Sequence, residues 1–569
     1  MRPAFAAVAL LVACAQPPPP PPAPPALPAA PSATAPARDR VISIVGTNDL
    51  HGHVEHLEVF AGYVARLREL RRHDGGVALV DAGDMFQGTL ESNLGEGQAV
   101  ISAFNALGYT AAALGNHDFD YGPVGERDAP GGDPRGALRA RLAEASFPML
   151  SANLIEKSTG RAPSWGNLHP STLVEVGGVK LGIVGVITRE TPQIVMPAHF
   201  AGLDVTPLAP AIVREAAALR RRGARAVVAL AHAGGVCSRH DDPKSASACN
   251  ADEELNQVAR ALPAGTVDAM IGGHTHQGVA HYFSGTAVAE AFALGRAFSR
   301  IDLTLFGDPS RRVEARVFPP QHICSDEKAS RCTAGDYEGG SVRSDPRIRA
   351  AVETWQTAAA ERRAEKLGVQ VVAEVRREYG VESPLGNLLA DLLLAASPGS
   401  EVAILNGGGL RAALPAGSLT YGQLYESQPF DNRVARLRLT GAELKRVIGL
   451  HLERGRHGII SLGGARLEAR CVGSELEVVL RRPNAQSITD TESVTVVTSD
   501  YLATGGDELF AGAGRPAPPG ETSPETVRDA LARELRKRGG SVGGEAPTVF
   551  DPKKPRLRLP GPRPVRCPR

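Results

Sequence analysis

The sequence predicts an α/β fold with two domains, and two features of the chain point to it. Between residues 41 and 307, short apolar runs alternate with amphipathic segments, as in a sheet flanked by helices. Five of the apolar runs end in residues that can bind a metal or transfer a proton. Because parallel strands deliver functional groups at their carboxyl ends, we expect these groups to gather at one edge of the sheet.

The elements of this first part are expected in a regular order. Strands are predicted at residues 41–45, 77–80, 111–114, 226–231 and 267–271. Helices are predicted at residues 57–72, 99–107 and 209–222. Two apolar runs, 173–176 and 179–186, are joined by Gly177 and Gly178, which predicts a hairpin.

The second half of the chain is organised differently. Ser344-Asp345-Pro346 predicts a helix over residues 347–366, because proline suits a first helical turn, and we place the domain boundary there. Beyond it a helix at 385–396 mixes with strands at 402–405 and 494–497, and residues 512–520 form a Gly/Pro-rich loop. Ser523-Pro524 is expected to cap a late helix over residues 525–537.

The N-terminus is predicted to be a targeting segment. Arg2 precedes an apolar run at residues 4–12 that is too short to span a bilayer, and the run ends in Leu11-Val12-Ala13-Cys14. This ending resembles a bacterial lipobox in which Cys14 accepts the lipid; an ordinary secretory signal is the alternative. Residues 17–37 are almost wholly Pro, Ala, Ser and Thr, which suits an extended spacer. We expect an exported lipoprotein at the periplasmic face, the outer membrane or the cell surface.

Together, the predicted N-terminal segment, linker helix and tail divide the chain into six parts. They are a signal peptide (1–14), a linker (15–39), a catalytic domain (40–340), a linker helix (341–366), a substrate domain (367–552) and a basic tail (553–569). The tail is expected to be a solvated terminus. Lys plus Arg number 63 against 62 for Asp plus Glu, so no overall field selects a nucleic acid polymer.

The cysteines suit an oxidising compartment. Six remain once Cys14 is set aside, an even number, and none forms a Cys-x-x-Cys pair that would suggest a zinc site. Cys237 with Cys249, and Cys324 with Cys332, are close enough in sequence to close short loops. Cys471 with Cys567 is the remaining pair and could pin the basic tail, although sequence alone does not fix the connectivity.

The strand ends collect seven potential metal ligands: Asp49, His51, Asp84, Asn116, His232, His274 and His276. Any one of them alone would more often be a hydrogen-bonded core residue, so only the set carries the argument. Imidazole and carboxylate ligands without thiolates suit zinc, manganese or iron in a hydrolytic site. Two ions need roughly seven protein ligands when one carboxylate bridges them, and Asp84 is the natural bridge.

Five motifs in this part resemble the calcineurin-like metallophosphoesterases: Asp49-x-His51, Gly83-Asp84, Gly115-Asn116-His117-Asp118, His232 and Gly272-Gly273-His274-Thr275-His276. More closely, they resemble the 5′-nucleotidase family, which includes periplasmic UDP-sugar hydrolases and 2′,3′-cyclic-nucleotide phosphodiesterases. The resemblance implies a four-layer α/β/β/α metallophosphoesterase domain followed by a smaller α+β domain.

The resemblance also implies a role for each residue of the first domain. Asp49, His51, Asp84 and His276 would hold one metal ion, and Asp84, Asn116, His232 and His274 the other. His117 and Asp120 would form a catalytic dyad, the histidine near the phosphoryl group and the aspartate orienting it. Asp81 and Asp118 are expected to make structural contacts.

The second half contains Glu382-Ser383-Pro384-Leu385-Gly386-Asn387, Asn406-Gly407-Gly408-Gly409-Leu410-Arg411 and Tyr501-Leu502-Ala503-Thr504-Gly505-Gly506-Asp507, which look like the 5′-nucleotidase C-terminal domain. The resemblance implies that Arg411 grips phosphate, Asn406 reaches the nucleoside, Phe430 and Tyr501 sandwich the base, and Asp507 binds the ribose. Two positions depart from the family pattern. Tyr501 stands where phenylalanine is commoner, which preserves stacking and adds a hydroxyl. Tyr379 stands where relatives have an arginine, and Arg376 or Arg377 could substitute for it.

The expected function is that of an exported enzyme with two divalent metal ions, which removes phosphate from nucleotides by means of a metal-bound hydroxide. A 2′,3′-cyclic-nucleotide phosphodiesterase or UDP-sugar hydrolase on the same scaffold is the nearest alternative. A catalytically silent nucleotide-binding lipoprotein is disfavoured by the complete ligand set. A partner protein on a thiosulfohydrolase scaffold is disfavoured by the nucleotide-type motifs of the second half. No obligate protein partner is inferred.

Overall fold

The computed structural model describes residues 38–125, 132–326, 332–455, 457–510, 521–543 and 549–568. The predicted signal peptide with Cys14, most of the linker and the loop at 512–520 lie outside the described residues. Within the described part of the chain, no helix combines the length and the apolar character needed to cross a membrane.

The first domain is built on two sheets. One has the strand order β15-β14-β1-β2-β3-β4-β6 and the other β12-β13-β11-β10-β8-β7. The first sheet contains β1 (Arg40–Thr47), β2 (Gly75–Asp81), β3 (Ala111–Ala113), β4 (Met149–Leu150), β6 (Leu168–His169), β14 (Ala297–Leu305) and β15 (Glu314–His322). The second contains β7 (Ser171–Val176), β8 (Val179–Ile187), β10 (Ala226–His232), β11 (Ala269–Gly272), β12 (Gly278–Phe283) and β13 (Thr286–Ala291).

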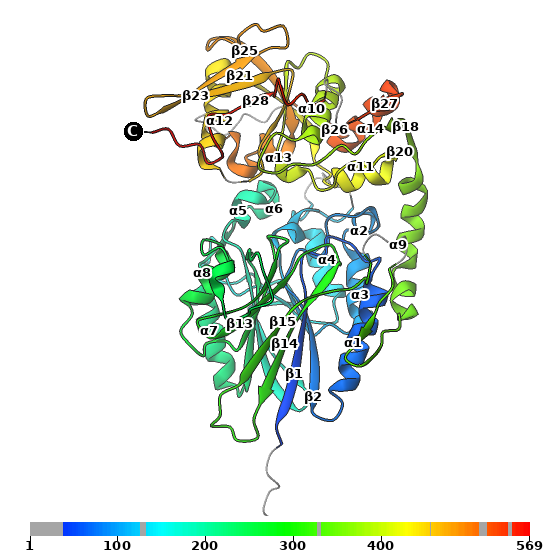
Figure 1. The fold of residues 1–569 in the computed structure, drawn as a ribbon, viewed down its shortest axis with the longest axis vertical. Coiled ribbons are helices and arrows are strands. Elements are labelled where there is room, and N and C mark those ends of the chain that lie inside the picture. Colours follow the sequence, from blue (N-terminus) through cyan, green and yellow to red (C-terminus); the bar gives the residue numbers. More distant parts are fainter. Residues whose placement is uncertain are drawn as a thin grey trace, which may run out of the picture. The chain divides into compact units, whose positions relative to one another are not determined.

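Helices cover the outer face of each sheet, so the domain has four layers (Figure 1). Ile44 and Val80 of the first sheet pack against Ile183 and Val228 of the second in one buried cluster. The helices α1 (Leu57–Leu70) and α3 (Gln98–Leu107) pack on the first sheet, and α7 (Leu208–Arg221) and α8 (Glu254–Ala261) on the second. The four-layer expectation is confirmed.

The single sheet suggested by the alternating pattern is wrong. The strands divide between two sheets, and β14 and β15 return to the first sheet beside β1; apolar alternation cannot tell which strands share hydrogen bonds. The parallel strands β1, β2 and β3 form the middle of one sheet, while β8, β10 and β11 run parallel in the other. The predicted hairpin is confirmed as β7 and β8.

The helix α9 (Pro346–Ala364) connects the two halves of the chain. The Asp345 side chain accepts a hydrogen bond from the Arg347 N–H, which caps the helix next to its first-turn proline. The helix packs on α1, α2 (Leu90–Leu94) and α3, and also on α11 (Tyr421–Ser427). It ends two residues before the predicted Lys366, where β18 (Lys366–Val371) begins.

The second domain centres on a five-stranded sheet with the order β22-β19-β25-β21-β26. Its strands are β19 (Val402–Leu405), β21 (Arg433–Thr440), β22 (Ser461–Gly463), β25 (Ser493–Ser499) and β26 (Glu521–Thr526). The helices α10 (Pro384–Ala396), α12 (Gly441–Arg454) and α14 (Val527–Arg538) pack against it. Smaller sheets join β18 to β20 (Gly417–Thr420) and β27 (Ser541–Val542), and β23 (Arg466–Val472) to β24 (Glu475–Arg481) and β28 (Leu557–Arg558).

The predicted cap of the last helix is wrong. Ser523 and Pro524 lie inside β26, and Thr526 caps α14 by accepting a hydrogen bond from the Asp529 N–H. A proline is tolerated there because β26 is the edge strand of its sheet. The Ser-Pro signal is therefore compatible with an edge strand as well as with a helix start.

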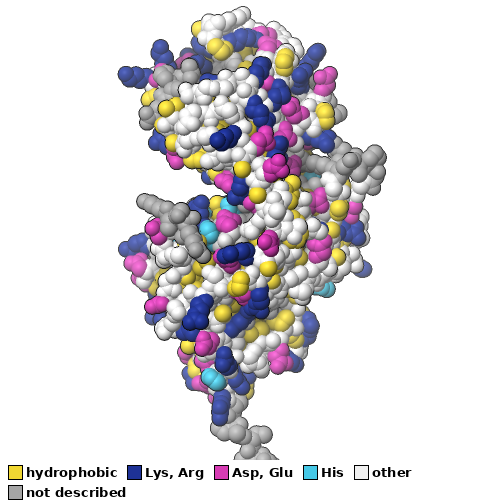
Figure 2. Space-filling model, turned by 90° about the vertical axis from the view of Figure 1, so that its right-hand side faces the viewer, with side chains coloured by type: hydrophobic (Ala, Val, Ile, Leu, Met, Phe, Trp, Pro, Cys, Tyr) yellow, Lys and Arg dark blue, Asp and Glu magenta, His cyan; other side chains and the backbone are white. Residues whose placement is uncertain are grey.

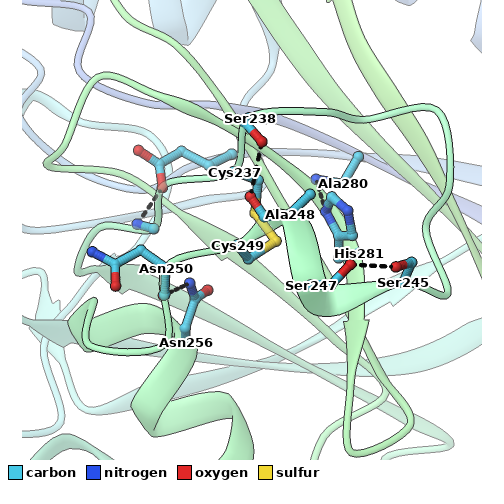
Figure 3. Close-up of a disulfide and its surroundings, with 12 residues drawn as sticks. Cys237, Ser238, Ser245, Ser247, Ala248, Cys249, Asn250, Asn256, Ala280 and His281 are labelled. Carbon is cyan, nitrogen blue, oxygen red and sulfur yellow. Dashed lines mark hydrogen bonds between the residues drawn. A yellow bond between two sulfur atoms is a disulfide. The ribbon is translucent and has the colours of Figure 1, made fainter.

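All three predicted disulfide pairs are present: Cys237–Cys249, Cys324–Cys332 and Cys471–Cys567. Figure 3 shows the first, in the loop between β10 and α8, with the Ser238 hydroxyl donating to the Ala248 carbonyl beside it. The third joins β23 to the end of the chain, so the expectation of a solvated tail is wrong. Residues 557–558 pair with β23, and Arg556 forms an ion pair with Asp391 at 2.6 Å.

Charged side chains of both signs are interspersed on the surface. On the face that Figure 2 shows, Lys and Arg side chains alternate with Asp and Glu side chains and do not gather into one large patch of a single sign. This distribution on the visible face is in keeping with the formal net charge of +1 of the whole chain.

Candidate active site

The seven predicted ligands lie together where the central strands of both sheets end. Asp49 and His51 follow β1, Asp84 follows β2, His232 ends β10, and His274 and His276 follow β11. The ligand atoms of Asp49, His51 and His276 all lie within 4.8 Å of one another, and so do those of Asp84, His232 and His274. Asn116 joins the second group, with its Oδ1 3.0 Å from His232 Nε2.

Asp84 links the two groups. Its Oδ2 is 3.8 Å from His51 Nε2 and 3.2 Å from His232 Nε2, and the residue is 1% exposed. Histidines of both groups therefore approach one carboxylate oxygen. This is the geometry expected of a carboxylate that bridges two cations.

Backbone carbonyls fix the tautomers of two histidines. His51 Nδ1 is 2.8 Å from the Gln87 carbonyl, and His232 Nδ1 is 2.9 Å from the Ala82 carbonyl. A carbonyl only accepts, so each Nδ1 donates, and Nε2 is the atom that would bind a metal ion when the ring is neutral. Buried carboxylates beside imidazole nitrogens are a donor set that fits divalent zinc, manganese or iron.

The electrostatics of the site also favour a cation. Burial, and then Arg411, hold the pKa of His51 well below its usual range, which keeps the ring neutral. Burial opposes the charge on Asp84, but His232 and His117 outweigh it and hold the pKa of that carboxyl well below its usual value. Burial also opposes charge on His232, yet Asp84 raises its pKa to about 10. The negative charge of Asp84, which raises the pKa of His232, would also stabilise a bound cation.

Five of the seven predicted ligands have a left-handed backbone: Asp49 (φ 48°), His51 (φ 49°), Asp84 (φ 58°), His274 (φ 85°) and His276 (φ 59°). Non-glycine residues adopt this conformation at a cost of about 1 kcal/mol or more each, and such outliers cluster at functional sites. Gly115 must be glycine because a Cβ there would lie 2.2 Å from both the amide and the carboxylate of Asp84.

The predicted dyad is formed in a single turn. Asn116–Phe119 is a 3₁₀ turn that brings His117 Nδ1 within 2.6 Å of Asp120 Oδ2. The backbone N–H of His117 donates to Asp84 Oδ1 at 2.8 Å. This bond connects the turn to the carboxylate that links the two ligand groups. Asp118 accepts from the Gly115 and Met85 amides, and Asp81 accepts from the Gly83 amide and the Thr47 hydroxyl. Those two carboxylates make the structural contacts expected of them.

The second-domain residues face the same space. One cavity of about 1530 Å³ is lined by Asp84, Asn116, His117, Asp120, His274 and His276 together with Asn406, Arg411, Phe430, Tyr501 and Asp507. Arg411 Nη2 lies 3.2 Å from His51 Nε2, and the Phe430 ring is 5.6 Å from the His117 ring. The Tyr501 hydroxyl donates to Asp507 Oδ1, and Asn406 donates to Asp507 Oδ2, each at 2.7 Å.

Glu290 is a site residue that the sequence analysis missed. This buried carboxylate accepts hydrogen bonds from the Gly235 amide and the Thr275 hydroxyl, and so holds the loop carrying His274 and His276. Burial and Asp49 raise its pKa well above the usual value. A signal was present, because Glu290 is the one charged residue of the run Thr286–Ala291.

Replacing Glu290 with alanine is expected to weaken metal affinity about 10- to 100-fold, as is typical when a partner that orients metal ligands is lost. Titration of the metal-free protein with Mn²⁺ or Zn²⁺ measures this. Glu290→Gln, which keeps one acceptor oxygen, should lie between alanine and wild type. Equal affinity in the alanine variant and the wild type would contradict the assigned role.

Comparisons with known proteins agree with this geometry. The family model of the calcineurin-like phosphoesterases matches residues 42–278, and that of the 5′-nucleotidase C-terminal domain matches residues 359–513. The trifunctional nucleotide phosphoesterase protein YfkN of Bacillus subtilis is 26% identical over 559 residues, covering 90% of this chain and 35% of that protein. A 5′-nucleotidase of Diplobatis ommata is 27% identical over 533 residues, covering 82% of each chain. The chain thus spans about a third of the first relative and four fifths of the second.

A solved structure shares the fold. The 5′-nucleotidase precursor from Thermus thermophilus superimposes with a TM-score of 0.70 at 22% identity, covering 91% of this chain and 99% of that one. The fold and the clustered ligands define a metal-dependent phosphoric ester hydrolase of the calcineurin-like type. With its second domain, the chain belongs to the 5′-nucleotidase family.

Proposed function

We propose that this enzyme removes phosphate from nucleotides, with two divalent ions of the zinc, manganese or iron type held by the seven predicted ligands. The observation that carries the proposal is the shared cavity, in which Asp84 and His117 face the same space as Phe430 and Tyr501. A nucleotide is a ligand with a phosphoryl group for the first pair and a planar base for the second. The names of the two relatives, a nucleotide phosphoesterase and a 5′-nucleotidase, support the same substrate class.

The residues of the chain divide the chemistry among them. Bound divalent ions supply Lewis acidity and lower the pKa of water, so that a nucleophile is available at neutral pH. Asp120 accepts from His117 Nδ1 and orients the ring, which leaves Nε2 to carry a proton toward the departing oxygen. Arg411 lines the cavity and would pair with phosphoryl oxygens, for which its planar guanidinium is suited.

The remaining pocket residues would bind the nucleoside. Phe430 and Tyr501 would stack on the base, an interaction worth about 1–3 kcal/mol per base that tolerates any base. Asp507 is held by Tyr501 and Asn406 and would accept hydrogen bonds from the ribose hydroxyls.

Replacing both Phe430 and Tyr501 with alanine is expected to raise KM for AMP by about 10- to 100-fold, since two stacking contacts are lost. The KM for p-nitrophenyl phosphate, which has no base, should change less than about threefold. Steady-state kinetics on both substrates measure the two effects. An equal rise for both substrates would remove the base-binding role of this pair.

Two other substrate classes fit the same scaffold. A panel of AMP, 2′,3′-cyclic AMP and UDP-glucose separates a nucleotidase from a cyclic-nucleotide phosphodiesterase and a sugar-nucleotide hydrolase. Highest kcat/KM for AMP is the result that the proposal predicts. No turnover of any of the three with Mn²⁺ or Zn²⁺ would favour the nucleotide-binding lipoprotein instead.

We also propose that the chain is exported and anchored through a lipid on Cys14, with the domain boundaries predicted from the sequence. The apolar run ending in Leu11-Val12-Ala13-Cys14 and the Pro/Ala-rich spacer support this. A Cys14→Ser variant should move from the membrane fraction to the soluble fraction. Retention of that variant in the membrane fraction would contradict the anchor.

A further inference from the structure

Gln87 is a buried residue of the cavity wall whose side chain has no part in the chemistry described above. It is 2% exposed, and its side-chain Nε2 and Oε1 are both buried without a hydrogen-bond partner among the described residues. Of the described residues that line the active-site cavity, it is the one with both a donor and an acceptor in this state. Burying such groups without partners costs free energy, which indicates that a polar partner enters from the cavity.

The backbone on both sides of the Gln87 side chain is held by hydrogen bonds and close packing. The Gln87 carbonyl accepts from His51 Nδ1 at 2.8 Å. The Phe86 carbonyl before it accepts from the Ser92 hydroxyl at 2.6 Å. The residue after it, Gly88, has no room for a Cβ, which would lie 2.3 Å from the His51 carbonyl oxygen. The side-chain amide is therefore the unpartnered part of an otherwise fixed segment beside a predicted metal ligand.

The surroundings of Gln87 favour an uncharged donor. The residue lies three positions after Asp84, and Asp84, Asn116 and His117 line the same cavity. A cationic side chain at this place would repel the divalent ions of the proposed site, and a carboxylate would repel the phosphoryl group. A carboxamide has neither effect, and its N–H can donate a charge-assisted hydrogen bond to a phosphoryl oxygen. The chemistry of residue 87 therefore matches the phosphoryl end of the substrate.

We propose that Gln87 binds the phosphoryl group of the substrate, with its Nε2 donating to a phosphoryl oxygen from the first-domain wall of the cavity. The amide has no partner in the free protein and gains one when the substrate binds. Its burial therefore disfavours the free protein and favours the complex. Oε1 accepts from a water molecule in the same cavity. This inference rests on the proposed function, because it adds a contact to the phosphoryl end of that substrate.

Equilibrium binding to the metal-free protein tests this contact without turnover. Gln87→Met keeps an unbranched side chain of similar length and removes the donor and the acceptor. By isothermal titration calorimetry with EDTA present, we expect this variant to bind AMP about 10- to 30-fold more weakly, as for the loss of a hydrogen bond to a charged group. Adenosine, which has no phosphoryl group, should bind within about twofold of the wild type.

Gln257→Met is the matched control for this substitution. Gln257 also lines the cavity, but its Nε2 already donates to the Asp252 carbonyl at 2.9 Å. This variant should bind AMP and adenosine like the wild type. Gln87→Glu gives a second comparison, because it keeps the shape of the side chain but sets a negative charge against the phosphoryl group. It should bind AMP more weakly than Gln87→Met does.

Thermal unfolding of the ligand-free protein separates a binding role from a structural one. Removing a buried amide that has no partner should leave the Tm of Gln87→Met within about 3 °C of the wild type or raise it. A Tm lowered by more than about 3 °C would overturn the proposal, because the amide would then support the fold.

The binding results decide the question in the same way. Equal AMP binding by Gln87→Met and Gln257→Met would overturn the proposal, and so would equal losses of AMP and adenosine in Gln87→Met. The proposed function is tested separately by AMP hydrolysis with added Mn²⁺ or Zn²⁺. A wild type that binds AMP through Gln87 but never hydrolyses it would refute the nucleotidase proposal and leave this contact standing.

Discussion

Asp84→Asn is expected to lower kcat for AMP roughly 10³-fold or more, because the substitution removes the one negative charge that both histidine groups share. Asparagine keeps the shape of the side chain and one oxygen for the His117 N–H, so the fold should survive. Metal-dependent hydrolysis of AMP measures the rate, and circular dichroism monitors the fold. A kcat above about a tenth of the wild-type value would contradict a bridging role.

Asp81→Asn is the matched control for this substitution. Asp81 is the last residue of β2, three residues before Asp84, and burial raises its pKa to about 8. An amide keeps an acceptor oxygen for the Gly83 N–H and a partner for the Thr47 hydroxyl, so it should replace this carboxyl with little effect, within about threefold in kcat. A loss in Asp81→Asn as large as in Asp84→Asn would show that any polar change at this strand end disables the enzyme.

The ligand set could be predicted from sequence because parallel strands deliver their functional groups at one end. His232 illustrates this, because it follows directly after the apolar run 226–231. The structure places it at the carboxyl end of β10, with its Nε2 3.2 Å from Asp84 Oδ2. The pairing of strands into two sheets could not be predicted, because strand–helix alternation is the same whichever sheet a strand joins. The four-layer fold came from the resemblance of the motifs to a family.

Other features of the site depend on tertiary contacts that leave no local pattern. The tautomer of His51 is set by the Gln87 carbonyl, and a backbone oxygen is the same in every residue. The left-handed backbone of Asp49 and Asp84 is held by the surrounding fold against local preference. Glu290 was detectable in principle, because a charge inside the apolar run Thr286–Ala291 needs a buried partner.

At position 379 the chain has a tyrosine where relatives have an arginine, and sequence and structure give different information about what replaces it. The motif around Glu382 showed that an expected arginine was missing, and sequence left Arg376 and Arg377 as equal substitutes. The structure separates them, since only Arg377 of the two lines the cavity. Side-chain direction in an irregular segment has no periodicity, so no pattern could have made that choice.

His117→Asn is expected to lower kcat for AMP about 10²- to 10⁴-fold, the range typical of a general acid. The nucleoside oxygen is a poor leaving group and needs a proton as it departs, which the imidazole held by Asp120 at 2.6 Å can supply. The p-nitrophenolate ion leaves without a proton, so kcat for p-nitrophenyl phosphate should fall much less, by about tenfold or under. The ratio of the two losses, measured by steady-state kinetics with the same metal, reports the proton transfer.

Asp120→Asn refines this prediction, because Asp120 acts only through His117. It should show the same preference for the better leaving group, with a smaller loss on AMP, and the double variant should be no slower than His117→Asn alone. Equal losses on the two substrates in His117→Asn would instead place the imidazole as a stabiliser of the phosphoryl charge. The 2.8 Å bond from the His117 amide to Asp84 is a backbone contact and persists in both variants, so these comparisons leave the metal ligands in place.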